Sequence, residues 1–255
     1  MRFASLGSGS QGNALVVEVK QTRLMLDCGF GINEVVARLS RLKLTPRDLN
    51  AIVVTHEHSD HAGGVVKLAC TFGLPVWVTF GTASALRAEF SSLPRVSFFG
   101  AHQRFGIGDI ELEPFPVPHD AREPAQFVFS DGARRLGVIT DTGSSTSHIE
   151  TVLSRCDALV LECNHDLEML KNGSYPAPLK RRIAGRFGHL SNDDAATLLA
   201  SLDCSRLQHL FAAHLSQYNN TPELARAALS CVLNCEPDGV GIADQQTGFA
   251  WREIA

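Results

Sequence analysis

The chain has 255 residues, of which 44% are hydrophobic and 20% charged, and its formal net charge is −4. This composition supplies enough apolar side chains for a sizeable core and excludes intrinsic disorder. The slightly negative charge excludes a global basic field, so any binding of phosphate groups must be local. No apolar run approaches the roughly 18 residues of a membrane-spanning helix, and we expect no contact with a membrane.

Cysteine usage and the first residues indicate the compartment. The seven cysteines are odd in number and include no Cys-x-x-Cys pair, which favours reduced thiols over a disulfide framework. The first residues lack the long apolar region of a signal peptide. We therefore expect a cytoplasmic protein with a single domain over residues 1–255, and the sequence leaves the oligomeric state open.

Strand-like runs and helical patterns alternate along the first hundred residues. Strands are predicted, in chain order, at 14–19, 23–27, 51–55, 75–79 and 96–99. A helix that Asn33 could cap follows the second strand, with inward-facing apolar residues Val35, Val36, Leu39 and Leu42. A second helix is predicted over 65–72. The β-branched run at 51–55 is typical of a strand buried on both faces.

The rest of the chain continues this alternation. Strands are predicted at 110–115, 126–129, 135–140, 158–162, 207–213, 239–243 and 249–252, and helices at 193–202 and 222–233. Two strand-rich halves with interleaved helices favour an α/β architecture, in which two sheets pack together and helices cover the outside.

The densest group of chemically active residues directly follows the strand predicted at 51–55. It reads Thr55-His56-Glu57-His58-Ser59-Asp60-His61. Because side chains alternate with a period of two in an extended segment, His56 and His58 point the same way and can hold one cation. Asp60 and His61 lie just beyond them and can hold a second. Nitrogen and carboxylate donors suit zinc, manganese or iron.

The spacing His56-x-His58-x-Asp60-His61 resembles the signature of the metallo-β-lactamase-fold hydrolases. Further motifs of that family have counterparts in the same order along the chain. They are Asp27 in Leu26-Asp27-Cys28-Gly29, His119 in Pro118-His119-Asp120, Asp141 in Thr140-Asp141-Thr142-Gly143, and His214 in Ala213-His214-Leu215. The resemblance implies a four-layer αββα sandwich with metal ions at the edge of its sheets.

The resemblance also implies a set of ligands for two divalent ions, zinc, manganese or iron. It assigns His56, His58 and His119 to one metal, Asp60, His61 and His214 to the other, and Asp141 to a bridging position. A hydroxide shared by the two ions would attack the substrate, with Asp60 helping to orient the attacking water. Asp27 is expected to orient a ligand or its loop. A simple turn role remains the alternative for Asp27 and Asp141.

Segments between Asp141 and His214 resemble a bacterial stand-alone phosphodiesterase and exonuclease branch of the family, the YycJ-like group. The segments that carry this likeness are Glu162-Cys163-Asn164-His165-Asp166, Gly173-Ser174-Tyr175-Pro176, Leu179-Lys180-Arg181-Arg182-Ile183 and Gly188-His189-Leu190-Ser191-Asn192, together with the opening Leu6-Gly7-Ser8-Gly9-Ser10-Gln11-Gly12-Asn13. The likeness implies 5′-to-3′ exonuclease activity on DNA. The distance from Asp141 to His214 leaves no room for the large cap domain of other nucleases in the family.

Residues near position 190 could act on a phosphate group. Ser191 or Asn192 can cap the predicted helix and leave backbone N–H groups for an anion, so we expect both to contact phosphate. His189 is expected to donate a hydrogen bond to a phosphoryl oxygen or to protonate the leaving alkoxide. A histidine with only a local hydrogen bond is the alternative.

A small basic cluster precedes this segment. Arg182 and Arg186 are four residues apart, so on one helix they share a face that contacts either phosphate or solvent alone. No role follows from the sequence for Asn164 or His165. The opening run Gly7 to Gly12 is not a P-loop, and we interpret it as a tight turn near the site.

Two other functions stay open at this level. The chain can be a hydrolase of small esters, thioesters or cyclic phosphates that has no nuclease activity. It can also be a metal-binding partner protein that has lost catalysis, although the complete set of ligand residues argues against that. The main expectation is a metal-dependent hydrolase whose substrate is DNA or a small phosphodiester.

Overall fold

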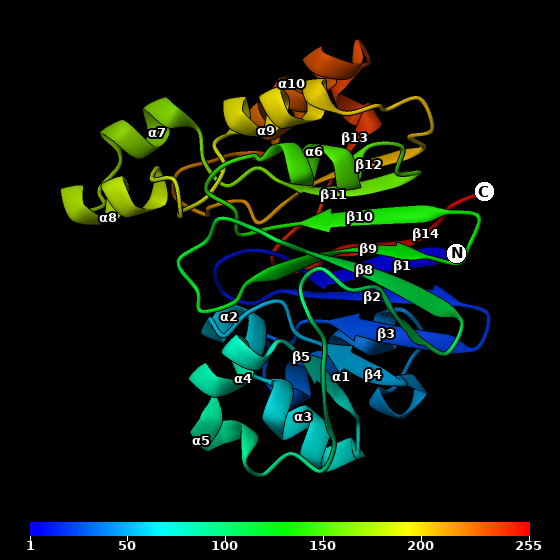
Figure 1. Ribbon diagram of the computed structural model, residues 1–255. Helices are drawn as coiled ribbons and strands as arrows, with labels where there is room; N and C mark the ends of the chain where they lie inside the picture. The colour runs from blue at the N-terminus through cyan, green and yellow to red at the C-terminus, as the bar shows by residue number, and fades with distance from the viewer.

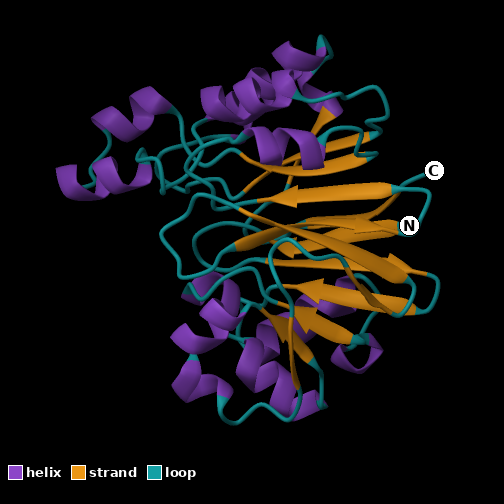
Figure 2. Ribbon diagram, viewed as in Figure 1, coloured by secondary structure: helices purple, strands orange, loops and turns teal.

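Within the described residues of the computed structural model, two seven-stranded sheets pack face to face (Figures 1 and 2). The structure describes residues 1–255, apart from the side chains of residues 88 and 89. Helices cover the outer face of each sheet, so the layers follow the αββα order expected from the sequence. The two chain ends meet on one side of the sandwich, where Ile254 N donates a hydrogen bond to Met1 O (2.9 Å).

The first sheet combines an antiparallel half with a parallel half. Its strands are, in spatial order, β14 (Phe249–Glu253), β1 (Arg2–Gly7), β2 (Ala14–Val19), β3 (Thr22–Leu26), β4 (Ala51–Val53), β5 (Val76–Val78) and β6 (Val96–Phe98). Pairing is antiparallel from β14 to β3 and parallel from β3 to β6. The helical segments in this half of the chain are α1 (Ile32–Arg41), η1 (Pro46–Asp48), α2 (Ser59–Ala62), α3 (Val65–Phe72), α4 (Phe80–Ala85) and α5 (Arg87–Phe90).

The second sheet also combines a parallel half with an antiparallel half. Its strands are, in spatial order, β13 (Val240–Ile242), β12 (His209–Ala213), β11 (Ala158–Glu162), β10 (Arg135–Ile139), β9 (Ala125–Ser130), β8 (Ile110–Pro116) and β7 (Phe105–Ile107). Pairing is parallel from β10 to β13 and antiparallel from β7 to β10. The helical segments in this half are α6 (Ser147–Leu153), α7 (Leu167–Asn172), α8 (Ala177–Ile183), α9 (Asn192–Ser201), α10 (Pro222–Leu233) and η2 (Pro237–Gly239).

Apolar side chains fill three layers of the sandwich. One cluster lies between the two sheets, and one lies between each sheet and its helices. All residues of strand β2 are buried. Both faces of the inner strands are covered, and their sequences are therefore mostly apolar rather than alternating between apolar and polar residues. No helix in the described part of the chain is long and apolar enough to span a bilayer.

Helix α1 differs from its prediction in two details. The residue before its first turn is Gly31, whose backbone is extended (φ −65°, ψ 154°), and Asn33 lies inside the helix. Val36 was expected to face inward but is 41% exposed. Its neighbours Val35 and Leu39 are fully buried and form the inner face. The helix therefore presents a narrower apolar stripe to the sheet than the sequence indicated.

The parallel strands of both sheets end at one edge of the sandwich. Polar residues follow within three positions of these ends, namely Asp27 after β3, His56 after β4, Asp141 after β10 and His214 after β12. Glu162 is the last residue of β11. In open α/β sheets this carboxyl edge is where ligands bind. Figure 1 shows α7 and α8 standing beside this edge, away from the rest of the second sheet's helices. The fold therefore gathers chemically active side chains from both sheets at one place.

Candidate metal centre

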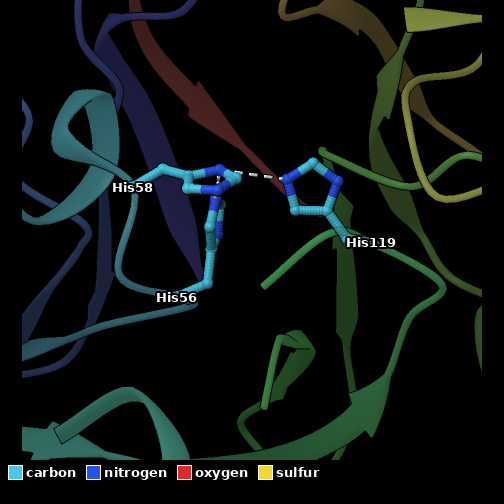
Figure 3. Close-up of side chains that lie close together, drawn as sticks. All are labelled: His56, His58 and His119. Carbon is cyan, nitrogen blue, oxygen red and sulfur yellow. Dashed lines mark hydrogen bonds between the residues drawn. The ribbon is translucent and has the colours of Figure 1, made fainter. Parts of the chain in front are cut away.

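Three histidine side chains converge at the edge of the sandwich (Figure 3). His56 and His58 lie in the loop between β4 and α2, and His119 follows β8. His58 Nδ1 lies 3.1 Å from His56 Nε2 and 3.2 Å from His119 Nε2. One ligand atom from each of the three lies within 4.8 Å of the others, a separation that suits one cation.

A second cluster lies against the first and combines carboxylates with imidazoles. It consists of Asp60 and His61 from α2, Asp141 after β10 and His214 after β12. His61 Nε2 lies 3.0 Å from Asp141 Oδ2, and His214 Nε2 lies 3.4 Å from both Asp60 Oδ2 and Asp141 Oδ1. The structure therefore brings together all seven residues that the resemblance assigned to metal binding, and their role as ligands stays a prediction.

Hydrogen bonds on the outer side of the rings set which nitrogen faces inward. His61 Nδ1 lies 2.7 Å from Asp27 Oδ2, and His119 Nδ1 lies 3.1 Å from Gly188 O. A carboxylate and a carbonyl only accept hydrogen bonds, so each ring must donate from Nδ1. The neutral ring then presents the lone pair of Nε2 to the interior, which is the form that coordinates a metal.

The chemistry of the second cluster requires a positive charge at its centre. Asp141 Oδ2 is buried and has no hydrogen-bond partner, although His61 Nε2 faces it. With the proton of His61 on Nδ1, both facing atoms are acceptors and repel each other. Either an extra proton on His61 or a cation between the groups relieves this repulsion. The donor set, two imidazoles with two carboxylates, fits a divalent metal ion.

The pKa shifts without a bound cation agree with this picture. Burial holds the pKa of His56 well below its usual range, helped by the neighbouring His61, and burial also lowers the pKa of His119. Burial works to lower the pKa of His61 too, but Asp141 and Asp27 outweigh it and raise that pKa. Burial would raise the pKa of Asp141, but His214 and His61 hold it well below the usual range. Asp141 is thus ionised, and His56 and His119 are neutral as metal coordination requires.

Asp27 lies next to the predicted metal ligands, where the sequence analysis expects it to orient a ligand or its loop. Besides accepting from His61, it accepts hydrogen bonds from Thr55 N and Thr55 Oγ1, both at 2.8 Å. Thr55 Oγ1 also lies 2.9 Å from His56 Nδ1. One buried carboxylate therefore fixes His61 directly and the start of the His56 loop through Thr55.

The opening loop contributes residues that sequence reasoning missed. Asn13 Nδ2 lies 3.1 Å from His61 Nε2 and 3.4 Å from Asp60 Oδ2, and Ser8 Oγ accepts from His214 N at 3.0 Å. Ser8 Oγ in turn donates to Asn13 Oδ1 at 3.0 Å. The expectation of a tight turn near the site is correct in position but incomplete in role. A polar Asn directly before a strand that begins with four apolar residues was the signal that could have drawn attention to this contact.

Two residues of the 162–166 segment also join the site. Asn164 Nδ2 donates to His214 O at 3.0 Å and lies 3.2 Å from His214 Nδ1, so it holds the backbone and ring of that histidine. His165 is buried, both of its ring nitrogens lack a hydrogen-bond partner, and burial lowers its pKa. It is therefore a neutral ring beside the site.

Glu162 is the largest omission of the sequence analysis. It is fully buried, and its Oε1 lies 2.8 Å from His189 Nδ1. Its other oxygen accepts from Thr142 N (2.9 Å) and Leu190 N (3.3 Å). Burial lowers the pKa of His189, but the charge of Glu162 outweighs this effect and raises the pKa to about 9. His189 is therefore held in place as a proton donor at neutral pH.

Two glycines allow the turn that carries His189 to approach the loop after Asp141. A Cβ atom on Gly143 would lie only 2.4 Å from Gly188 N, and one on Gly188 would lie 2.2 Å from Arg182 O. Real Cβ atoms do not approach other atoms this closely. Only glycine at both positions lets the ring of His189 stack on that of His214, with centroids 5.3 Å apart.

Ser191 and Asn192, for which phosphate contacts were predicted, lie away from the cleft, and those contacts stay a prediction. Both residues are buried, and neither lines the cleft. Ser191 Oγ donates to Asp194 Oδ2 (2.6 Å) and accepts from Asp194 N (3.1 Å), which forms a capping box at the start of α9. Asn192 pairs its amide with that of Asn220. Their polar groups serve the helix and the core, because burial keeps them from solvent.

The two arginines do not share a helix face, since α8 ends at Ile183 and Arg186 lies beyond it. Arg182 lines the cleft, and its Nε donates to Asp120 Oδ2 at 2.6 Å. The other oxygen of Asp120 lies 3.6 Å from His119 Nε2, so this ion pair adjoins the metal cluster. The guanidinium of Arg186 instead lies 5.8 Å from the ring of Phe187, outside the cleft.

A cleft of about 320 Å³ opens over the metal cluster. It is lined by polar groups of both clusters, by His189, and by residues of α8 and the turn before it. The cleft therefore gives solvent access to both clusters and to His189.

Comparisons with known proteins place these observations in context. Residues 22–210 match the family model described as the β-lactamase superfamily domain. The chain is 39% identical to the exodeoxyribonuclease YycJ of Bacillus anthracis, over 95% of this chain and 93% of that protein. It is 34% identical to the exodeoxyribonuclease WalJ of Streptococcus pneumoniae, over 94% and 91%. The metallo-β-lactamase fold protein YhfI of Bacillus subtilis superposes with a TM-score of 0.75 at 18% identity, over 99% of both chains, which shows the same fold.

Proposed function

The chain belongs to the β-lactamase superfamily and to the family of the YycJ and WalJ exodeoxyribonucleases, and from this premise we propose that it is a metal-dependent exodeoxyribonuclease. The observation that carries the proposal is the meeting of both His/Asp clusters and the Glu162–His189 pair in one cleft. The two relatives named exodeoxyribonucleases align with more than nine-tenths of this chain. We extend the proposal to 5′-to-3′ polarity, which the resemblance of the sequence implies.

The proposed metal sites follow the two clusters. His56, His58 and His119 would hold one divalent ion, Asp60, His61 and His214 a second, and Asp141 would contact both. Zinc, manganese and iron all suit these donors. When bound, such ions lower the pKa of a water molecule and offset the charge on a phosphoryl oxygen.

The side chains of the protein supply the proton chemistry and the orientation. Asp60, 21% exposed at the cleft, would accept a hydrogen bond from the attacking water and orient it toward phosphorus. His189 keeps its proton at neutral pH because Glu162 stabilises the imidazolium. Its Nε2 would protonate the leaving alkoxide, which the high pKa of an alcohol makes a necessary step. Glu162 acts through His189 and is a positioning residue.

Two cationic groups at the cleft support a phosphate-containing substrate, namely Arg182 and the imidazolium of His189. Asp60, Asp120 and Asp141 also line the cleft, and bound divalent ions would offset their charge. We further propose a cytoplasmic location, which seven unpaired cysteines support because thiols persist in reducing compartments.

The test is nuclease activity with matched histidine variants. Terminally labelled DNA incubated with Mn²⁺ should release mononucleotides, and His58→Ala should reduce the rate by at least a hundredfold. His148→Ala is the control, because this exposed histidine of α6 lies outside the cleft and should leave the rate unchanged. Equal rates for wild type and His58→Ala would overturn the proposal.

The same preparation separates the other two functions. Hydrolysis of chromogenic phosphodiesters or thioesters without any release of nucleotides would favour a small-molecule hydrolase. Stoichiometric metal without turnover of any substrate would favour a non-catalytic metal-binding protein.

A further inference from the structure

Helix α8 carries apolar side chains that have no core to pack into. None of its residues is buried. Leu179 and Ile183 are four residues apart on one face, and Tyr175 lies one further turn before them, in the segment that leads into the helix. All three line the cleft over the metal cluster. We call Tyr175, Leu179 and Ile183 the α8 wall.

The cleft thus combines two chemically different sets of lining residues. His58, Asp60, His189 and His214 are polar, whereas the residues of the α8 wall are mainly apolar. A nucleotide has the matching division, with an anionic phosphate at one end and a flat base at the other. The cleft volume of about 320 Å³ lies at the low end of the roughly 300–1,000 Å³ of small-ligand pockets, which suits one nucleotide.

We propose that the α8 wall binds the unpaired base of the nucleotide whose phosphate is cleaved, an inference that rests on the proposed nuclease function. The phosphate lies at the polar residues and near Arg182 of α8, which donates only from Nε to Asp120 and keeps its two terminal amino groups free among the described residues. The base lies against Tyr175, Leu179 and Ile183. A paired base cannot reach the wall, so the substrate is a single-stranded or frayed end.

The wall also explains how the site would accept every base. Leu179 and Ile183 carry no polar atom that could read a base edge, whereas stacking and apolar contact are available to all four bases. Tyr218 extends the surface outward. It is 68% exposed, and its ring centroid lies 6.0 Å from that of Tyr175 at an angle of 66°. These are the only two tyrosines of the chain, and Tyr218 reaches the cleft only through its contact with Tyr175.

The test compares intact and abasic substrates. Single-stranded oligonucleotides that carry either an intact terminal nucleotide or a tetrahydrofuran residue in its place are incubated with the full-length protein and Mn²⁺. The quantity compared is kcat/KM for cleavage of the two ends. For wild type we expect kcat/KM to be about tenfold higher for the intact end, mostly through KM, as one stacked base provides. The four intact bases should differ by less than threefold.

Variants assign this preference to the wall. Leu179→Ala and Tyr175→Ala should bring the ratio of intact to abasic kcat/KM close to one, and Tyr175→Phe should keep it. Leu167→Ala is the matched control, because Leu167 is an exposed leucine of the neighbouring α7 that does not line the cleft. Because Tyr175 and Leu179 are only partly buried, these variants should lower the unfolding temperature little. Fluorescence anisotropy in EDTA should show the same base preference in binding alone.

The outcomes are separable. Equal kcat/KM for intact and abasic ends in wild type would overturn the inference while leaving the nuclease function in place. An unchanged ratio of intact to abasic kcat/KM in Leu179→Ala would also overturn the inference and leave the nuclease function in place. Failure of wild type to cleave any intact oligonucleotide would overturn the nuclease function and this inference with it.

Discussion

Three of the polar residues at the sheet edge have a backbone conformation that side chains rarely adopt. Asp27, Asp141 and His214 have φ angles of 60°, 53° and 56°, in the left-handed region. Such a conformation costs on the order of 1–3 kcal/mol per residue and persists where the surrounding structure enforces it. Each residue lies one or two positions after the end of a strand that pairs in parallel, so the left-handed turn directs its side chain over the edge toward the clusters. Part of the backbone strain of the chain therefore lies where the proposed chemistry takes place.

The role of Asp27 predicts the effect of an isosteric substitution. Asp27→Asn keeps the size of the side chain, but an amide nitrogen facing His61 Nδ1 would move the ring proton to Nε2 and remove the inward lone pair. We expect a 10- to 100-fold loss of metal affinity, as is typical when such a partner is lost. Isothermal titration calorimetry with Zn²⁺ measures this loss. Asp238→Asn, at a residue 97% exposed, is the control, and equal affinities for Asp27→Asn and wild type would refute the role.

The Glu162–His189 pair predicts a pH effect in the metal-free protein. The pKa of His189 is raised from 6.5 to about 9 in the fold, so its protonation contributes stability that is fully present below pH 6.5. That contribution is lost as pH rises through about 9. In Glu162→Gln the negative charge that raises the pKa of His189 is removed. The pKa of His189 should then fall, because burial disfavours the charged ring. NMR titration of the His189 ring measures both values, and the same pKa in both proteins would contradict the assignment.

At the scale of elements, the length of each segment decided how well it could be predicted. Strands β2 and β11 show long apolar runs, helices α3 and α10 show a helical period, and the predicted bounds of all four agree with the structure. The buried strand β1 and the short strand β7 were not predicted. Helices α4 to α8 span only 4 to 7 residues, too few turns for a periodic pattern, and were missed as elements. Short helices depend on tertiary contacts for their stability, which a local pattern does not contain.

The start of α9 predicts a stability effect without a binding effect. Ser191→Ala removes the hydroxyl of the capping box, and we expect the free energy of unfolding to fall by about 0.5–2 kcal/mol. The KM for DNA should not change, because Ser191 is buried away from the cleft. Urea unfolding and steady-state kinetics measure the two quantities. Ser191→Thr should retain the free energy of unfolding. A large rise in KM for Ser191→Ala would contradict this prediction and support the phosphate contact expected from the sequence.

At the scale of the whole molecule, the candidate metal centre joins the two halves of the sandwich. His56, His58, Asp60 and His61 follow strand β4 of the first sheet, whereas His119, Asp141 and His214 follow strands β8, β10 and β12 of the second. A cation held by both groups links sheets that otherwise meet mainly through apolar packing. Without a cation, the ionised Asp141 depends on the charge of His61 and His214.

This arrangement predicts that metal removal destabilises the entire fold. Binding at a thousand times Kd stabilises a native state by about 4 kcal/mol, and for a protein of this size each kcal/mol shifts Tm by about 2–4 °C. We therefore expect EDTA to lower Tm by roughly 10 °C. Calorimetry measures the shift, excess Mn²⁺ or Zn²⁺ should reverse it, and His58→Ala should show a smaller one. An unchanged Tm after verified metal loss would argue against a link between the sheets.

The sequence by itself indicated most of the strands and two packed sheets covered by helices, but it predicted neither β1 and β7 nor the order of the strands in each sheet. Seven residues that meet at the edge of the sandwich were also singled out from the sequence. Their types and their positions at strand ends are local properties, and a buried apolar run followed by His or Asp is visible in the chain. The resemblance to a family joined five such motifs into one set. Substrate class followed from the same segments, since they carry the likeness to nucleases.

Only the tertiary structure decided which groups support that set. Glu162 and His189 are 27 residues apart, Asn13 and His61 are 48 apart, and Ser8 and His214 are 206 apart, yet each pair is in hydrogen-bond contact. The fold also buried Ser191 and Asn192 and turned the α8 wall toward the cleft. Hydrogen-bond partners and burial depend on how the two sheet edges pack in space. The separation of two residues along the chain does not predict that packing.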